Sequence, residues 1–143
     1  MIKNENSHNP IPQGKYKPAT RYNDIIYTSG MTPRKEGVLI QTGKVTNKKP
    51  IIIYKKSVEQ ATFNALTATK SLLNKNETIE EVILLKVYIN TDNNFRDHSN
   101  IADFSSDYLY KVTGTPFLGS RVTIGVSSLP GNAPVEIHII SAV

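Results

Sequence analysis

Hydrophobic and polar residues alternate along two segments near the end of the chain, residues 121–126 and residues 135–139. A period of two residues is typical of a β-strand that buries one of its faces. The segment between them, residues 127–134, contains two prolines and a glycine and is predicted to be a loop. The pattern therefore predicts two strands joined by a loop at this end of the chain.

If these two strands pair antiparallel across the loop, their side chains can be assigned to two faces. The apolar face, predicted to be core, consists of Val122, Ile124, Val126, Val135, Ile137 and Ile139. The polar face consists of Arg121, Thr123, Gly125, Glu136 and His138, with Ile140 at its end. The residues of the polar face can be explained either by a ligand pocket or by a face exposed to solvent. Alternation alone favours the solvated face, because antiparallel sheets often expose one side to water.

The first part of the chain predicts a tail and three short strands. Residues 1–14 are polar and aperiodic, and we expect a flexible N-terminal tail ahead of one domain at residues 15–143. Residues 16–22 and 25–29 flank an Asn-Asp dipeptide, which predicts a hairpin. A third strand is predicted at residues 38–41, after a loop.

The middle of the chain predicts two helices that flank a buried strand. Ser57 is a good N-cap for a helix that ends near residue 73, and its apolar residues form one stripe. Residues 82–90 are almost continuously apolar, as expected for a central strand covered on both faces. The second helix is predicted from about Asp97 or Ser99 to Val112.

The resulting order, β-β-β-α-β-α-β-β, predicts an α+β fold with a mixed β-sheet and two helices on one face. The opposite face of the sheet is then either wet or buried by another chain. Several predicted strand residues are more apolar than a wet face requires, namely Tyr27, Val38, Ile40, Val87 and Ile89. This composition indicates an oligomer.

Composition narrows the class of protein further. A chain of 143 residues with 38% apolar and 20% charged residues is typical of one globular domain. Cysteine is absent, which excludes disulfides and a thiolate zinc site. No apolar run has the length of a membrane span, and the N-terminus has no apolar signal-peptide core, so a cytoplasmic protein is the default expectation.

The formal net charge of +5 raises the possibility of nucleic-acid binding. The basic residues are scattered, however, without a basic helix face or an aromatic RNA-binding motif, which favours a lysine-rich surface. His8, His98 and His138 are far apart in sequence and no acidic cluster accompanies them, so no metal site is expected.

Three segments, taken in order, resemble the RidA (YjgF) family of enamine/imine deaminases. Residues 16–30, YKPATRYNDIIYTSG, are similar to the family's opening pattern PYS-x-A…G-N-x-x-x-x-SG. An Asn-Ala-Leu motif at residues 64–66 precedes the buried strand, and residues 121–140 are close to R-(S/T)-x-V-x-V-x-x-L-P-x-x-A-x-V-E-I. The resemblance covers about residues 16–142. It implies a chorismate mutase-like fold and a homotrimer with pockets at the three subunit interfaces.

The resemblance also implies roles for individual residues. Arg121 matches the arginine that pairs with the substrate carboxylate, a task suited to a planar guanidinium with two parallel donors. Glu136 matches the glutamate that positions or activates the attacking water, and burial would raise its pKa toward a useful range. A third match, Tyr16, implies a pocket tyrosine.

Four further positions follow from the same comparison of patterns. Ser29 and Gly30 match the strand end that lines the pocket. Thr123 stands where many members have cysteine, so its backbone remains a donor while thiol chemistry is lost. Asp103 falls near the position of a pocket asparagine, and a carboxylate there would repel an anionic substrate.

The leading hypothesis is hydrolytic deamination of a small 2-aminoacrylate-like enamine or imine carboxylate to a 2-keto acid and ammonium. No cofactor is expected, because an imine carbon is already electrophilic. The alternative is a non-catalytic trimeric module that binds a small carboxylate, favoured by Asp103 and by Thr123 in place of cysteine. A ribonuclease or translation inhibitor, claimed for relatives, lacks a recognisable acid/base pair on a basic groove.

Overall fold

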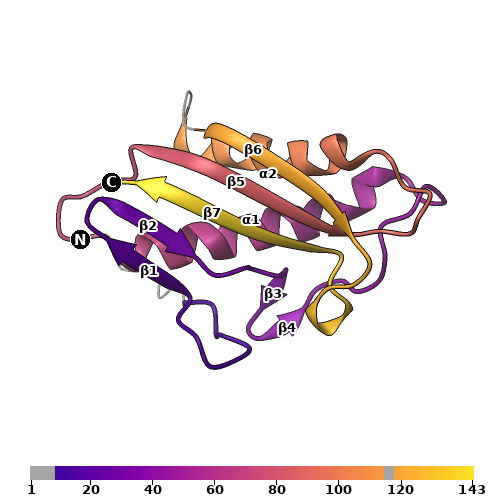
Figure 1. Cartoon of the computed structure of the whole chain (residues 1–143), viewed down its shortest axis with the longest axis horizontal. Helices are drawn as coiled ribbons and strands as arrows, with labels where there is room; N and C mark the ends of the chain where they lie inside the picture. The colour runs from indigo at the N-terminus through magenta and orange to yellow at the C-terminus, as the bar shows by residue number, and fades with distance from the viewer. Residues whose placement is uncertain (1–8, 115–117) are drawn as a thin grey trace.

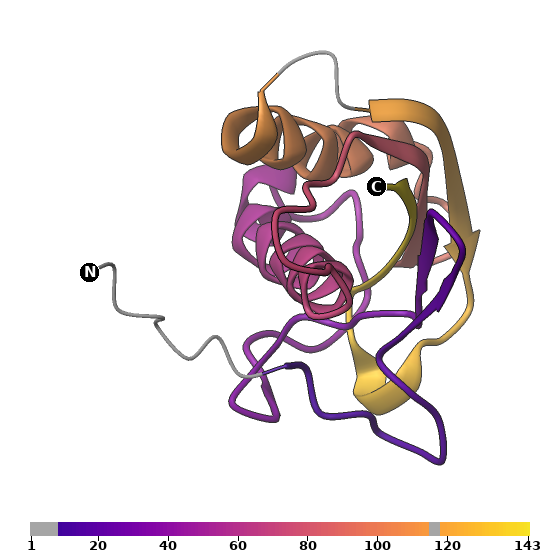
Figure 2. The same cartoon turned by 90° about the vertical axis from the view of Figure 1, so that its left-hand side faces the viewer.

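The computed structural model describes residues 9–114 and 118–143, so most of the predicted N-terminal tail lies outside the described residues. A five-stranded sheet with strand order β1-β2-β7-β5-β6 forms one layer (Figure 1). Its strands are β1 (Ala19–Tyr22), β2 (Ile25–Thr28), β5 (Glu81–Asn90), β6 (Leu118–Val126) and β7 (Val135–Ala142). Two helices, α1 (Lys55–Lys70) and α2 (His98–Thr113), lie together on one side of this sheet (Figure 2). The predicted fold class is confirmed.

The third predicted strand forms, but it does not join the main sheet. Strand β4 (Val38–Leu39) pairs antiparallel with β3 (Arg34–Lys35) in a separate two-stranded ribbon. The reason is the two-residue turn between them, where Glu36 and Gly37 have φ angles of 53° and 81°. Two consecutive positive φ angles make a tight hairpin, which folds β4 back onto the chain just before it.

The predicted N-cap of the first helix is wrong by three residues, because the observed N-cap is Tyr54. A short 3₁₀ helix, η1 (Ile51–Tyr54), leads directly into α1, so the helix begins at Lys55 and Ser57 lies inside its first turn. The Ser57 hydroxyl donates instead to Gln41 Oε1 at 2.5 Å, which ties α1 to the segment that follows β4.

The predicted antiparallel pairing of the last two strands is also wrong, because β5 lies between them. β5 runs parallel to β6 and antiparallel to β7. Tyr88 of β5 is aligned with both Ile124 and Glu136, whereas Leu85 is aligned with both Arg121 and Ile139. Residues at alternate positions of a strand face opposite sides. Glu136 therefore shares a face with Ile124, and Arg121 lies on the other face.

The helix-covered face contains the main core. Its fully buried side chains include Ile26, Leu85, Val87, Ile89, Ile137 and Ile139. The small residues of α1, among them Ala61, Ala65 and Ala68, are also buried and allow the helix to approach the sheet closely. Between the helices, Ser105 Oγ and Thr62 Oγ1 lie 2.7 Å apart, so each of these buried hydroxyls has a partner.

The face without helices remains apolar at several positions. Tyr27, Val122 and Ile124 are 42%, 39% and 42% exposed. Of the residues cited from the sequence as a sign of oligomerisation, Tyr27 is on this open face, but Val87 and Ile89 are in the core instead. Exposed apolar side chains on this face are consistent with the predicted association. The homotrimer remains a prediction.

The loop between β6 and β7 is held against the end of β5 by polar contacts. Asn90 Nδ2 donates to the carbonyl oxygen of Ala133 at 3.1 Å and to Asn132 Oδ1 at 3.2 Å. The Lys44 ammonium donates to Asn90 Oδ1 at 2.9 Å and also to the carbonyl oxygen of Ser127. These contacts fix the loop that enters β7, and with it the position of Glu136.

An ion pair anchors the segment after α1 to β1. Arg21 donates to both carboxylate oxygens of Glu77, at 2.5 and 2.9 Å. The backbone N–H of Asn74 also donates to Glu77, at 2.6 Å. The Arg21 hydrogen bonds, followed by the Asn74 backbone, lower the pKa of Glu77 from 4.5 to about 2. A carboxyl with a lowered pKa stabilises the fold above its unfolded pKa, and this contribution is lost as the pH falls through its folded value.

We therefore expect Glu77→Gln to reduce the acid sensitivity of the fold. The melting temperature of the wild type should exceed that of the variant near neutral pH, and the difference should shrink between pH 4.5 and about 2, where Glu77 becomes protonated. Circular-dichroism melts at a series of pH values measure this difference. Asp24→Asn is a matched control, because Asp24 lies 3.8 Å from Arg21 and is 83% exposed. A constant difference across the acid range would contradict this role of Glu77.

Candidate functional site

Glu136 and Gly30 lie against each other where β2 ends. Met31 N–H donates to the Ile137 carbonyl at 2.7 Å and Ile137 N–H donates back at 2.8 Å, so the chain after β2 continues alongside β7. A Cβ atom added at Gly30 would lie 2.7 Å from Glu136 Cδ and still closer to its Oε1. Gly30 is therefore needed for space, because any side chain there would displace the Glu136 carboxylate.

The Glu136 carboxylate is half-buried, and no hydrogen bond to it is found among the described residues. Burial raises the pKa of this carboxyl above its ordinary value. A carboxylate without protein partners can accept a proton from a bound water or ligand. A raised pKa in a cavity wall is also a common property of catalytic carboxyls. Glu136 can therefore accept a proton from a molecule bound in either adjacent cavity.

Two cavities meet at this pair of residues. The first has a volume of about 450 Å³ and lies among residues 9–13, the β3–β4 ribbon and α1. The second has a volume of about 400 Å³ and lies on the open face of the sheet. Both are lined by Gly30 and Glu136, so the carboxylate can be reached from either side. Cavities of this size are typical of sites for small molecules.

The predicted pocket residues Tyr16 and Ser29 differ in their positions. Tyr16 lines the first cavity, and its hydroxyl accepts a hydrogen bond from the Gln13 N–H at 3.3 Å. Ser29 lines neither cavity. Its hydroxyl donates to the Lys17 carbonyl at 2.6 Å, and its N–H donates to the Pro18 carbonyl at 2.8 Å. Ser29 thus holds the segment that carries Tyr16 beside the end of β2.

Arg121, Asp103 and Thr123 form a separate group on the helix-covered face. Arg121 Nη1 donates to Asp103 Oδ1 at 2.6 Å and to Ser106 Oγ at 3.0 Å, so α2 binds the guanidinium. Thr123 is aligned with Val87 and lies on the same face. The prediction that Arg121 and Thr123 share one polar face with Glu136 is wrong, because it assumed that β6 and β7 are neighbours.

Lys86 and Tyr88, which were not predicted from the sequence, line the open-face cavity together with Glu136. The sequence does contain an indication of Lys86 as a site residue. This lysine is a charged residue within the apolar run of β5, and the residues on either side of it are buried. His138 also lines this cavity. Its Nδ1 atom is buried and has no partner among the described residues.

The described residues contain no group of three or more histidine, cysteine, aspartate or glutamate side chains able to hold a metal ion. Among the described helices, none combines the length and the hydropathy needed to cross a membrane.

The fold is similar to that of several solved structures. A protein of unknown function from Agrobacterium tumefaciens superposes with a TM-score of 0.84 and 28% identity, covering 90% of this chain and 82% of that one. The YjgF gene product of E. coli gives a TM-score of 0.69 at 17% identity, covering 93% and 91%. E. coli TdcF with bound serine gives 0.67 at 18% identity, covering 94% and 92%.

Sequence comparison identifies the family to which the chain belongs. The family model described as endoribonuclease L-PSP matches residues 6–143. A RutC family protein of Aquifex aeolicus (strain VF5) is 30% identical over 134 residues, which cover 92% of this chain and 91% of the relative. The chain therefore belongs to the YjgF/RutC/RidA family, and the resemblance noted in the sequence is confirmed.

We expect Gly30→Ala to displace the Glu136 carboxylate while the fold persists, because the clash involves the end of a flexible side chain. The pKa of Glu136, followed by carbon-detected NMR titration, should move toward its ordinary value as the carboxylate enters solvent. Overpacking should cost about 1–3 kcal/mol of stability. The double variant with Glu136→Asp, whose side chain is shorter, should recover part of that loss. An unchanged Glu136 pKa in Gly30→Ala would contradict the contact.

Proposed function

We propose that the protein hydrolyses small reactive enamine or imine carboxylates, of the 2-aminoacrylate type, to 2-keto acids and ammonium. The observation that carries this proposal is the half-buried Glu136 carboxylate with a raised pKa, held at the junction of two cavities. Membership of the YjgF/RutC/RidA family supports a role in small-molecule deamination or a related reaction. The relative TdcF binds serine, which is a small molecule with a carboxylate.

The chemistry requires water and proton transfer only. Protonation of the methylene carbon of the enamine gives the imine, whose C2 carbon is electrophilic. Glu136 accepts a proton from water as the water oxygen bonds to C2, and the C=N bond becomes a C–N single bond. Glu136 then returns this proton to the nitrogen and carries the proton of the new hydroxyl group to it as well, so the C–N bond breaks, the C=O bond forms and ammonia leaves. The raised pKa of Glu136 suits a group that must both accept and return a proton.

Arg121 is proposed to hold the substrate carboxylate, in a site shared between two copies of the chain. Within one chain, Arg121 and Glu136 lie on opposite faces and on strands separated by β5, about 10 Å apart across the sheet. One small substrate cannot contact both. β6 is an edge strand of the described sheet, so its Arg121 and the backbone near Thr123 can border the Glu136 cavity of a neighbouring subunit. Tyr16 and Gly30 would come from the same subunit as Glu136.

A second candidate function, binding of a small carboxylate without turnover, is favoured by one observation. Asp103 already occupies the guanidinium of Arg121 at 2.6 Å, and its side chain is 52% exposed. A substrate carboxylate must compete with this ion pair. A weakly anchored substrate loses the fixed orientation that catalysis requires.

Glu136→Gln tests the catalytic role directly. With 2-aminoacrylate generated in situ from serine by a dehydratase, wild type should release ammonium faster than the spontaneous reaction, and the variant should lose about 10²–10⁴-fold in kcat. In the wild type, kcat/KM should fall as the pH drops through the pKa of Glu136, at a higher pH than the 4.5 of an ordinary glutamate. Equal turnover by the two proteins would exclude Glu136 as the base. Absence of turnover in the wild type would favour the binding module.

The roles of Arg121 and Asp103 can be distinguished by two substitutions. Arg121→Ala should lower kcat/KM by about 10–100-fold, because it removes charge-assisted hydrogen bonds to the substrate. Asp103→Asn should lower KM, because the neutral amide releases the guanidinium that the carboxylate now holds. Asp107→Asn, an exposed change on the same helix, serves as the control. A higher KM in Asp103→Asn would show that Asp103 positions Arg121 for the substrate instead of competing with it.

A further inference from the structure

The open-face cavity contains three polar side chains that the proposed reaction does not use, Lys86, Tyr88 and His138. In the register of β5 and β7, Lys86 lies opposite His138 and Tyr88 lies opposite Glu136. These four side chains therefore form a compact block on one face of the sheet. Lys86 and Glu136 occupy its diagonal, where Cβ atoms of neighbouring strands are about 7–8 Å apart or slightly less.

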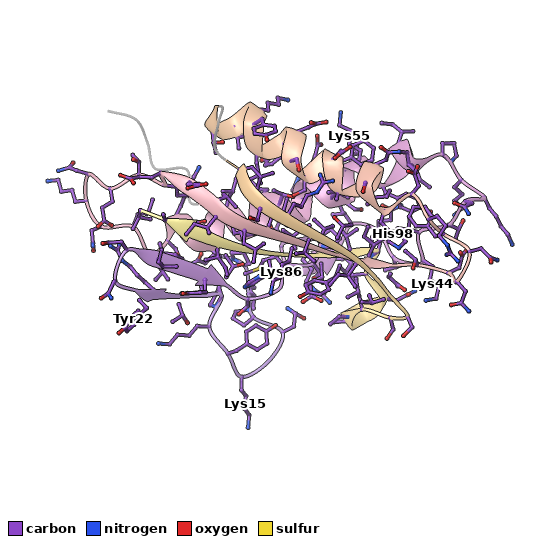
Figure 3. All side chains as sticks on the ribbon, turned by 45° about the horizontal axis from the view of Figure 1, so that its top comes forward. Lys15, Tyr22, Lys44, Lys55, Lys86 and His98 are labelled. Atoms are coloured by element: carbon purple, nitrogen blue, oxygen red, sulfur yellow. The ribbon has the colours of Figure 1, made fainter. Side chains whose placement is uncertain are left out.

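Lys86 has an unusual position for a lysine. It lies at the centre of the sheet (Figure 3), is half-buried, and is aligned with Val122 on one side and His138 on the other. Among the described residues it forms no ion pair, whereas Arg21 and Arg121, two other cationic strand residues, each pair with a carboxylate. A half-buried ammonium that makes no ion pair is available to bind an anionic ligand in the cavity.

His138 points to the same conclusion by an independent observation. Its Nδ1 atom is buried and has no hydrogen-bond partner in the described chain, although buried polar atoms nearly always have one. Burial, and then the positive charge of Lys86, lower the pKa of the imidazole. A neutral imidazole beside an ammonium can complete the binding of a carboxylate by donating one N–H.

We propose that this cavity binds a second carboxylate of the substrate, and that the protein prefers imines of short acidic amino acids to those of neutral ones. This inference rests on the proposed function, because the imine carbon must lie at Glu136. Lys86 and His138 would then hold the distal carboxylate, one short carbon chain away. A phosphate dianion fits less well, because the cavity offers one ammonium and also contains the Glu136 carboxylate.

The test compares dicarboxylate and monocarboxylate ligands in wild type, Lys86→Met and the exposed control Lys70→Met. Imines are generated in situ by amino-acid oxidases from glutamate and from 2-aminobutyrate, and ammonium release gives kcat/KM for each. Wild type and the control should prefer the glutamate-derived imine by about tenfold or more, as expected for a charge-assisted contact. Lys86→Met should lose this preference, and Lys86→Arg should retain part of it.

Calorimetry keeps the two proposals distinguishable. Binding of 2-oxoglutarate and of 2-oxobutyrate, which resemble the products, is measured with the same proteins and needs no turnover. Tighter binding of 2-oxoglutarate that depends on Lys86 would support the second carboxylate site even if no imine is hydrolysed, in which case the proposed reaction alone fails. Equal affinity for the two keto acids in wild type, or a preference that survives in Lys86→Met, would overturn the second carboxylate site whatever the deaminase activity.

Discussion

The arrangement of this protein depends on the two hydrogen-bonded edges of β5. One edge pairs with β6 in parallel and the other pairs with β7 in the antiparallel sense, so a single strand aligns both. Because side chains alternate across a sheet, this alignment turns Glu136 to the open face and Arg121 toward α2. The contact with Gly30, the ion pair with Asp103 and the block around Lys86 all follow from it. A shift of either neighbour by one residue would reverse these assignments.

Local patterns were sufficient for much of the fold. The apolar stripes, the buried run of β5 and the turn residues placed both helices and all five strands of the main sheet to within a few residues. The predictions were wrong where the structure depends on contacts between residues distant in sequence. Nothing near β6 indicates that β5 separates it from β7. The ribbon formed by β3 and β4 depends on positive φ angles at Glu36 and Gly37, and Ser57 resembles a cap only if η1 is overlooked.

Part of the candidate site could be predicted from the sequence, and the basis of the prediction differs from residue to residue. Glu136, Gly30 and Tyr16 were identified from a family pattern, and the structure brings them to one cavity. The same pattern gave Arg121 and Asp103, but it could not show that the two bind each other, because charge attraction between β6 and α2 depends on tertiary packing. Lys86 was hidden by an almost continuous apolar run, although a lysine in a central strand is itself a reason to expect a ligand or a partner.

The position of β6 at the edge of the sheet affects how readily the chain aggregates while it folds. This nine-residue strand has a neighbour on one side only in the described sheet, and Val122 and Ile124 are exposed on its open face. Long uncovered edges recruit strands from other molecules, and proteins usually blunt them with outward charges, proline or bulges. The single charge of β6, Arg121, is neutralised by Asp103. We therefore expect the edge to be protected by rapid association with a correct partner, so that newly made subunits are most prone to aggregate before that partner arrives.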